Sequence, residues 1–384
     1  MLHAGGTGMK PMLTVIGLMS GTSLDGVDAA IIHTDGERIA GFGPDISLPY
    51  TAALRQRARG ILDHAPTLSP DDPELKAVEH AITRHHIDAV RQLQAMAPDI
   101  DLIGFHGQTI LHAPQRRQTW QIGDAGQLSR ATGVAVIHDF RSADVAAGGE
   151  GAPLVPWFHA ALLHDVPGPV AVLNIGGVAN VTFIDADNTI HACDTGPGNA
   201  LLDDWAMRHT GTACDVDGGL ARAGTVNRAI VEQLLADPYF ARPAPKSLDR
   251  QSFATALDRV AACTPADGAA TLAAFTIEAV RRTPLPARPA RWYVCGGGRH
   301  NPVLMQGLQA ALGAPVEAVD RLGWNGDALE AQCFGFLAAR SARGLPLSAP
   351  TITGGPDGLS GGRLTCAGLM PVPSWIHATS GRRS

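Results

Sequence analysis

The sequence of 384 residues has few cysteines, few aromatic residues and no long apolar run. Its six cysteines are widely spaced and never form a C-x-x-C pair, which argues against a disulfide framework and against a zinc site. No run of 18 apolar residues is present, so no membrane-spanning helix is expected. Because no signal-peptide pattern precedes the first apolar run either, we expect a cytoplasmic protein with reduced thiols.

Charge is limited as well. The chain has 36 acidic and 30 basic residues, a net charge of -6, and 45% apolar residues. This balance is typical of a globular protein, and the absence of a basic stripe argues against nucleic acid as a partner.

Two common phosphate-binding motifs are missing. The chain contains no G-x-x-x-x-G-K-[ST] loop, and no G-x-G-x-x-G sequence opens a βαβ unit. If the protein binds a phosphate, other glycine-rich segments must hold it.

The chain is longer than one hydrophobic core usually spans, roughly 250 to 300 residues, so we expect two domains with a cleft between them. We place them at residues 13–150, completed by a segment near 345–372, and at residues 151–344. Residues 1–11 and the last ten residues are expected to lie outside the fold. The glycine-rich segment 148–153 is interpreted either as the hinge or as a surface loop.

The opening segment, residues 17–28, is a loop of small residues between two apolar runs, at 12–19 and 27–32. This pattern predicts a β-hairpin with Asp25-Gly26 as its turn dipeptide. Backbone N–H groups in such a loop can approach a phosphate closely. The pattern recurs at 170–184, where the loop is 176–180, and the repeat predicts a duplicated domain.

Other patterns predict the remaining elements. A strand is predicted to end at Phe105 and to be followed by polar residues 106–112, and another is predicted at 134–137. Asp194 follows a strand at 189–193, and a Gly-Gly-Gly turn follows the strand at 292–295. Asn301 is the expected N-cap of the helix that follows this turn. Helices are predicted over 74–96, 200–209, 272–282, 302–312 and 327–343.

Several polar candidates have purely structural alternatives. Asp194 is interpreted as a catalytic carboxylate or as a turn former or helix cap. Glu330 forms a capping-box pattern with Asp327, which would make it structural. Asp25 is explained by the turn alone, although a place near a metal ion is the alternative.

Arg141 has two interpretations of equal weight. A guanidinium suits a planar anion such as a carboxylate of the substrate. The alternative is an ion pair with Asp139 or Asp144.

Two hairpin-led halves, an aspartate and a triple-glycine turn resemble the superfamily of actin, heat-shock chaperones and sugar kinases. Within it, five motifs resemble the anhydro-N-acetylmuramic acid kinase family over about residues 13 to 350. They are Gly17-Leu18-Met19-Ser20-Gly21-Thr22-Ser23-Leu24-Asp25-Gly26-Val27-Asp28, His106-Gly107-Gln108-Thr109, Leu173-Asn174-Ile175-Gly176-Gly177-Val178-Ala179-Asn180, Asp194-Thr195-Gly196-Pro197-Gly198-Asn199 and Val294-Cys295-Gly296-Gly297-Gly298.

The resemblance implies an α/β fold of two duplicated, actin-like domains around a central cleft. It also implies an enzyme that uses ATP and Mg²⁺ to open the 1,6-anhydro ring of the sugar with water and to phosphorylate O6, in cell-wall recycling. The expected partner is therefore a small amino sugar, with a homodimer as a further option. Two alternatives stay open: a kinase for another sugar, and an actin-like or chaperone-like ATPase without sugar chemistry.

The resemblance also assigns roles to residues. Asp194 matches the family's catalytic base. The residues expected to bind the nucleotide are Ser20, Gly21, Thr22, Ser23, Leu24, Asp25, Gly26, Val27, Asp28, Gly176, Gly177, Asn180, Gly296, Gly297 and Gly298. The residues expected to bind the sugar are Gln108, Thr109, His138, Arg141 and Glu330. Metal ligands are not assigned.

Overall fold

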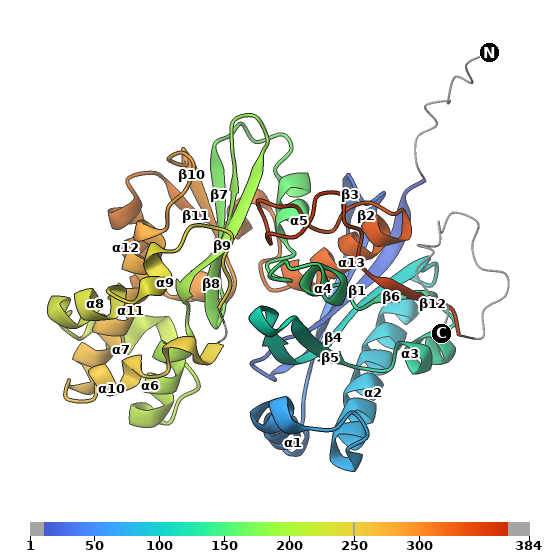
Figure 1. The fold of residues 1–384 in the computed structure, drawn as a ribbon, viewed down its shortest axis with the longest axis horizontal. Coiled ribbons are helices and arrows are strands. Elements are labelled where there is room, and N and C mark those ends of the chain that lie inside the picture. The colour runs from blue at the N-terminus through green and yellow to red at the C-terminus, as the bar shows by residue number, and fades with distance from the viewer. Residues whose placement is uncertain (1–10, 249, 368–384) are drawn as a thin grey trace.

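A computed structural model describes residues 11–248 and 250–367, which form two mixed β-sheets with helices around them (Figure 1). The first sheet has the strand order β12-β6-β4-β1-β2-β3, with β5 paired to β4, and the second has the order β11-β10-β7-β8-β9. The strands of the first sheet are β1 (Leu13–Ser20), β2 (Gly26–Thr34), β3 (Ile39–Pro49), β4 (Leu102–Ala113), β5 (Gln118–Ile122), β6 (Val136–His138) and β12 (Arg363–Thr365). Those of the second are β7 (Val170–Ile175), β8 (Val178–Ile184), β9 (Ile190–Pro197), β10 (Arg291–Cys295) and β11 (Val316–Ala318).

The two sheets share one topology. In the first, β1 pairs antiparallel with β2 and parallel with β4, and β2 pairs antiparallel with β3. In the second, β7 pairs antiparallel with β8 and parallel with β10, and β8 pairs antiparallel with β9. The predicted α/β fold with duplicated mixed sheets is therefore confirmed.

Four of the five predicted helices match the structure within two residues at each end, whereas α11 begins at Pro265 and not at residue 272. The predicted helix 74–96 is α2, which begins at Pro73 after the N-cap Asp72. Asn301 caps α12 and Gly211 ends α6, both as predicted. The described helices are α1 (Ala52–His64), α2 (Pro73–Met96), α3 (Ala125–Thr132), α4 (Ser142–Ala146), α5 (Pro156–Leu162), α6 (Ala200–Thr210), α7 (Gly219–Arg222), α8 (Arg228–Leu235), α9 (Pro238–Ala241), α10 (Ala256–Arg259), α11 (Pro265–Arg282), α12 (Pro302–Leu312) and α13 (Leu329–Ala342).

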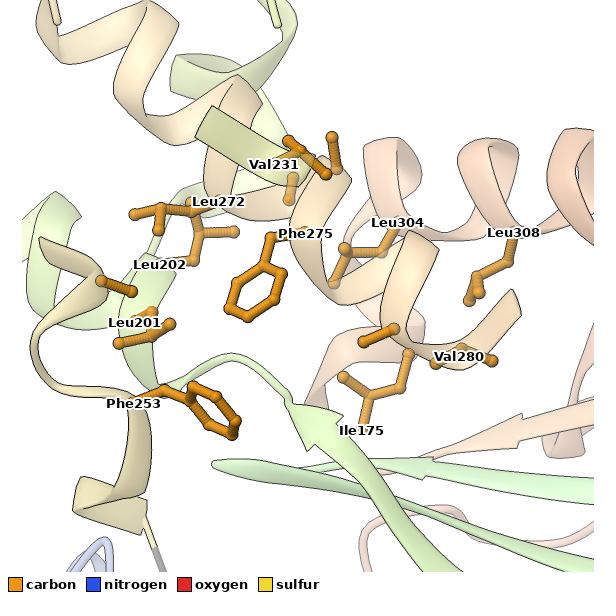
Figure 2. Packing of buried hydrophobic residues seen from close by; sticks show 14 of the residues in the cluster. Ile175, Leu201, Leu202, Val231, Phe253, Leu272, Phe275, Val280, Leu304 and Leu308 are labelled. Carbon is orange, nitrogen blue, oxygen red and sulfur yellow. The ribbon is translucent and has the colours of Figure 1, made fainter. Parts of the chain in front are cut away.

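The helices that follow β9 cover the outer face of the second sheet. Figure 2 shows Phe275 of α11 at the centre of this packing, with Leu272 on the same helix and Leu304 and Leu308 on α12. Ile175 at the end of β7 belongs to the same buried cluster. Because this face is filled by side chains from α11 and α12, the opposite face of the second sheet is the one left to face the first.

The late part of the chain returns to the first sheet. Helix α13 packs so closely on β1 and β4 that a Cβ on Gly17 would lie 1.7 Å from the carbonyl oxygen of Ala331, and one on Gly104 would lie 2.1 Å from that of Phe334. Strand β12 then pairs antiparallel with β6 at the sheet edge. Helix α13 thereby carries its N-terminal residues to the place where the two sheets approach each other (Figure 1).

The first hairpin forms, but its predicted turn is wrong. Strand β1 ends at Ser20 and β2 begins at Gly26, so Asp25-Gly26 is not a two-residue turn. The left-handed residue is instead Leu24, with φ 61°, and its amide donates to the carbonyl of Gly21. Gly26 is required for close packing, since a Cβ there would lie 2.2 Å from the carbonyl oxygen of Leu48. Burial of the Leu24 side chain offsets the strain of its left-handed backbone.

Two further predictions need correction. Strand β4 does not end at Phe105 but continues to Ala113, because β5 pairs with its second half. The segment 148–153 is not a surface loop, since Gly149 and Gly151 are buried and the amide of Glu150 donates to the carbonyl of Thr353. Of the segments expected to lie outside the fold, residues 1–10 and the last ten residues are outside the described part of the chain. Within residues 11–248 and 250–367, no helix is long and apolar enough to cross a membrane.

Candidate active site

Asp194 lies within β9 and is buried, with 6% of its surface exposed. Its carboxylate accepts a 2.7 Å hydrogen bond from the amide of Leu248, and its backbone carbonyl accepts one from the hydroxyl of Tyr239. The side chain does not cap the following helix, because α6 has Asn199 at its N-cap position. The alternative that Asp194 is a turn former or helix cap is therefore wrong.

The environment of Asp194 favours a proton acceptor. Burial raises the pKa of its carboxyl to about 7, opposed by the hydrogen bond from Leu248 and by the charges of Arg141 and Lys246. The nearby carboxylate of Glu150 acts in the same direction as burial, and about 7 is the balance of all these effects. A carboxyl group with a pKa near the working pH is well matched to general base catalysis.

A row of polar residues crosses the second sheet beside Asp194. Asn174 on β7 pairs with Asn180 on β8, and Asn180 pairs with Asp194 on β9. Register partners project from the same face of a sheet. Leu173 and Val181, the neighbours of these asparagines in sequence, enter the core on the other face. The polar row therefore lies on the face turned toward the first sheet.

Glu330, at the start of α13, contacts Asn174 of this polar row. Its carboxylate is accessible to water yet largely surrounded by protein, and it forms a hydrogen bond with Asn174. Reduced contact with bulk solvent raises its pKa, and the charge of Asp28 raises it further. The capping-box alternative is wrong, because Ala328 is the N-cap residue of α13 and no side chain caps that helix. Asp327 instead forms an ion pair with Arg299 at 2.9 Å.

Arg141 lies between carboxylates of both halves. Its Nε donates to His106 Nε2 at 3.0 Å, and its Nη1 donates to the carbonyl of Gly151 at 2.7 Å. The charges of Glu330, Asp194 and Asp144 act on its guanidinium. Among the described residues, neither Asp139 nor Asp144 forms an ion pair with it, and its hydrogen bonds go to His106 and Gly151. The alternative of an ion pair with Asp139 or Asp144 is therefore wrong within the described chain.

The loop between β1 and β2, residues 21–25, is held in place by hydrogen bonds of the neighbouring side chains Ser20 and Gln108. The buried hydroxyl of Ser20 bonds to the hydroxyl of Tyr50 at 2.7 Å and donates to Gln108 Oε1 at 2.6 Å. The side-chain Nε2 of Gln108 donates to the carbonyl of Gly21. Gln108 has no exposed surface, so its contacts are those of a residue that positions the loop.

The remaining residues predicted around this loop differ in exposure. Thr22 and Ser23 are exposed, whereas Leu24 and Val27 are buried. Asp25 is exposed and lies 3.3 Å from Arg55 in an ion pair.

Asp28 comes next along β2 and is half-buried. Burial raises its pKa, and a hydrogen bond to Ser47 opposes that rise.

The glycine turns of the second half lie against each other and against α6. The carbonyls of Gly176 and Gly177 accept hydrogen bonds from the amides of Asn199 and Gly198. Gly296 has φ 75°, and a Cβ there would lie 2.4 Å from the side-chain oxygen of Asn174.

The other two glycines of the triple-glycine turn differ. A Cβ on Gly298 would lie 2.5 Å from the Ile175 side chain, whereas one on the exposed Gly297 would meet nothing closer than 3.6 Å. Gly296 and Gly298 thus bring the turn against β7, and Gly297 is the exposed member.

Thr109 and His138 form their hydrogen bonds with residues outside the polar row. The hydroxyl of Thr109 accepts a hydrogen bond from Gln121 on β5. The ring of His138 bonds to Thr365 on β12, at the edge of the first sheet. Neither side chain contacts Asp194, Arg141 or Glu330 through a hydrogen bond in the described part of the chain.

A cavity of about 290 Å³ opens beside Asp194, between the β4–β5 hairpin and the segment 237–253. Its lining residues are His112, Pro114, Gln115, Asp237, Tyr239, Arg242, Ser247, Leu248, Ser252 and Phe253. Ser247 donates a 2.5 Å hydrogen bond to Glu150, and Leu248 donates to Asp194. Nothing local in the sequence identified Leu248 or Glu150 as neighbours of Asp194. Within the described ranges, no group of three or more His, Cys, Asp or Glu side chains is placed to hold a metal ion.

Comparison with known proteins shows which family this chain is similar to. The family model described as anhydro-N-acetylmuramic acid kinase matches residues 13–366. A relative of that name from Gluconobacter oxydans (strain 621H) is 60% identical over 351 residues, covering 89% of this chain and 97% of its own. Another from Acidiphilium cryptum (strain JF-5) is 57% identical over 357 residues, covering 92% of this chain and 98% of its own.

Among solved structures, the activator of the 2-hydroxyisocaproyl-CoA dehydratase from Clostridium difficile with bound ADPNP is similar with a TM-score of 0.41 and 13% identity, covering 85% of this chain and 96% of its own. A ROK family glucokinase from Streptomyces griseus in complex with glucose and AMPPNP is similar with a TM-score of 0.37 and 16% identity, covering 85% of this chain and 99% of its own. On the family model and the close relatives, this chain belongs to the anhydro-N-acetylmuramic acid kinase family.

Proposed function

We propose that this protein is an ATP-dependent kinase that opens the 1,6-anhydro ring of anhydro-N-acetylmuramic acid with water and phosphorylates O6. Its product is N-acetylmuramate 6-phosphate, an intermediate of peptidoglycan recycling. Besides family membership, one observation carries the proposal: Asp194 presents a buried carboxyl with a pKa of about 7 beside a cavity between the two halves.

Asp194 acts as the general base on water. As the water oxygen bonds to C1 of the sugar, one of its protons passes to a carboxylate oxygen of Asp194. The hydrogen bond from the amide of Leu248 to Oδ2 fixes the orientation of the carboxylate during this transfer. The electron pair of the C1–O6 bond leaves with O6.

O6 then attacks the γ-phosphorus of ATP. The new O6–P bond forms as the bond from the γ-phosphorus to the β–γ bridging oxygen breaks, and ADP carries away that electron pair. Catalysis of such a transfer rests on positioning and on charge stabilisation. The exposed Thr22 and Ser23 of the first loop, with Gly176, Gly177 and Asn180 across the cleft, bind the phosphates. The exposed Gly297, supported by Gly296 and Gly298, lies against the adenosine.

The carboxylates in this region fit a hard cation that arrives with ATP. The charge of Asp28 raises the pKa of Glu330, and the charges of Asp25, Asp45 and Asp327 raise that of Asp28. Such a concentration of oxygen donors favours Mg²⁺, which needs only one or two protein carboxylates besides phosphate oxygens. Asp28 and Glu330 are the residues that would hold it. Mg²⁺ would neutralise charge on the transferred phosphoryl group.

Arg141 recognises the substrate's carboxylate. The lactyl group of muramic acid ends in a planar anion, which a guanidinium binds well. Arg141 is held by His106 and Gly151 within electrostatic range of Asp194 and Glu330, and this position supports a contact with the reacting sugar. The adjacent cavity holds the rest of the sugar, with Ser247 and Gln115 as polar lining residues.

Two lobes close over the substrates. We assign residues 13–150, with the described part of the segment near 345–372 (up to residue 367), to one lobe and residues 151–344 to the other, except that α13, which packs on β1 and β4, belongs to the first lobe. The glycine-rich segment 148–153 is the hinge. Helix α13 lies on the first sheet and carries Glu330 toward the second, so closure changes the distance between Glu330 and Asp194. We also propose a homodimer, which a size measurement in solution tests.

A coupled assay of ADP release tests the function. Anhydro-N-acetylmuramic acid should stimulate ADP release strongly, and N-acetylglucosamine should not. Mass spectrometry should find one phosphoryl group and one water added to the anhydro sugar. Release of ADP that no sugar stimulates would refute the proposal and would favour an actin-like or chaperone-like ATPase, whereas equal stimulation by N-acetylglucosamine would indicate a kinase for another sugar.

A further inference from the structure

We propose that His106 is a positioning residue for the substrate, because it holds Arg141 in place as a neutral hydrogen-bond acceptor. This inference rests on the proposed function and adds a residue to the recognition of the substrate's carboxylate. His106 is not itself in contact with the sugar. It acts through the guanidinium of Arg141.

The hydrogen bonds of His106 define a single tautomer. Its Nδ1 lies 2.9 Å from the carbonyl oxygen of Gly107 and must donate to it, since a carbonyl can only accept. Its Nε2 is then the unprotonated nitrogen and accepts from Arg141 Nε at 3.0 Å. The two contacts are consistent only with a neutral ring protonated at Nδ1.

The ring is also fixed in orientation. His106 is buried, with 4% of its surface exposed, and its ring packs on that of Phe334, with centroids 4.4 Å apart and planes 35° apart. Gly107 has φ 73°, and a Cβ there would lie 2.6 Å from the carbonyl oxygen of Ile122. The bend at this glycine lets its carbonyl reach back to the ring of His106. Burial and the charge of Arg141 both hold the pKa of His106 well below its usual value, so the ring stays an acceptor.

The second anchor of Arg141 comes from the segment between the sheets. The carbonyl of Gly151 accepts from Nη1, while the amide of Gly151 donates to Asp144 at 2.7 Å. Asp144 in turn accepts from the hydroxyl of Thr353. Two anchors on different edges of a planar guanidinium fix its plane. Within the described chain, the Nη2 group has no hydrogen-bond acceptor, which leaves it for an anion.

A neutral acceptor explains how Arg141 keeps its charge for the substrate. A carboxylate at position 106 would bind Nε equally well but would neutralise the guanidinium. Asp194 and Glu330 already lie within electrostatic range and would draw a free arginine toward themselves. The histidine holds the side chain away from an ion pair with either acid while adding no negative charge. Arg141 therefore remains a positive group that is oriented but not paired.

Two substitutions separate this role from simple packing. His106→Phe keeps an aromatic ring against Phe334 but removes the acceptor, and His106→Gln keeps an acceptor of similar reach. A second variant without a reaching acceptor, His106→Asn, serves if the Phe variant does not fold. Each is measured alone and combined with Arg141→Ala, with the anhydro sugar and with the same sugar lacking the lactyl group.

His106→Phe should raise the KM for the anhydro sugar by about 10- to 100-fold, the loss expected for one hydrogen bond to a charged group. The KM for ATP should stay within about twofold, and His106→Gln should recover most of the sugar affinity. In the Arg141→Ala background, His106→Phe should cause no further loss, because the group it positions is gone. The sugar without the lactyl group should bind the wild type and His106→Phe equally.

Three results would overturn the inference. Additive losses in the double variant would show that His106 acts independently of Arg141. An equal loss for both sugars would show a packing role. If the wild type itself showed no sugar-dependent ADP release, the proposed function would fall, and this inference with it, whereas failure of the His106 variants alone would leave that function standing.

Discussion

Replacing Asp194 with Asn separates catalysis from folding at one position. Asn has nearly the same shape, and its side-chain oxygen can still accept the hydrogen bond from the amide of Leu248. It cannot take a proton from water at neutral pH. We expect kcat to fall by about 10²- to 10⁴-fold, the range of general base catalysis, with the KM for the sugar little changed.

The same substitution should stabilise the fold at high pH. The pKa of Asp194 rises from 3.8 in the unfolded chain to about 7 in the folded protein. Folding therefore favours the protonated form, and the stability that this gives below pH 4 is lost as the pH rises through 7. Since one pKa unit is worth about 1.4 kcal/mol, ionisation of Asp194 costs on the order of 4 kcal/mol at pH 8. Asn avoids this cost.

Two assays test this reasoning. Sugar-dependent ADP release of the wild type should rise with pH to a plateau above 7, and Asp194→Asn should lack that rise. Urea unfolding should show the variant more stable than the wild type at pH 8 and nearly equal to it at pH 4. Turnover of the variant within threefold of the wild type, or a lower stability at pH 8, would refute the assignment of Asp194 as a buried base.

Three further substitutions test the cleft. Gly296→Ala should lower the free energy of unfolding by at least about 1 kcal/mol, from its positive φ, and raise the KM for ATP. The control Gly297→Ala adds a Cβ at an ordinary contact distance of 3.6 Å from the Asn199 side chain and should fold normally. Gln108→Leu should cost about 1 to 3 kcal/mol by leaving its buried partners unpaired, and should raise the KM for ATP by loosening the loop at Gly21. Glu330→Gln should raise the Mg²⁺ concentration needed for half-maximal rate by about tenfold or more.

For each of these three predictions, one result would contradict the reasoning. Equal stability of the Gly296 and Gly297 variants in thermal unfolding would remove the packing role given to the first of them. An unchanged KM for ATP in Gln108→Leu would show that the loop does not bind phosphate. An unchanged Mg²⁺ titration in Glu330→Gln would exclude Glu330 as a metal ligand.

Local patterns determined the elements of this protein because they depend on neighbours in the chain. The apolar spacing of 74–96 identified α2, and Asn301 before Pro302 identified the start of α12. The repeated hairpins indicated the duplication that the two sheets share. The family motifs likewise lie within short segments, and the family they indicated is confirmed.

The contacts of each polar residue, in contrast, depend on how distant segments of the chain pack together. Burial between two halves of the chain raises the pKa of Asp194 to about 7, and the opposing hydrogen bond comes from Leu248, which lies 54 residues away. Arg141 forms its hydrogen bonds with His106 and Gly151 and not with the acids beside it in sequence. Asp327 forms an ion pair with Arg299 and does not cap α13. The physical reason is the same in each case: a side chain's partner and its pKa depend on packing between distant segments, whereas a helix or a turn depends mainly on the residues next to it.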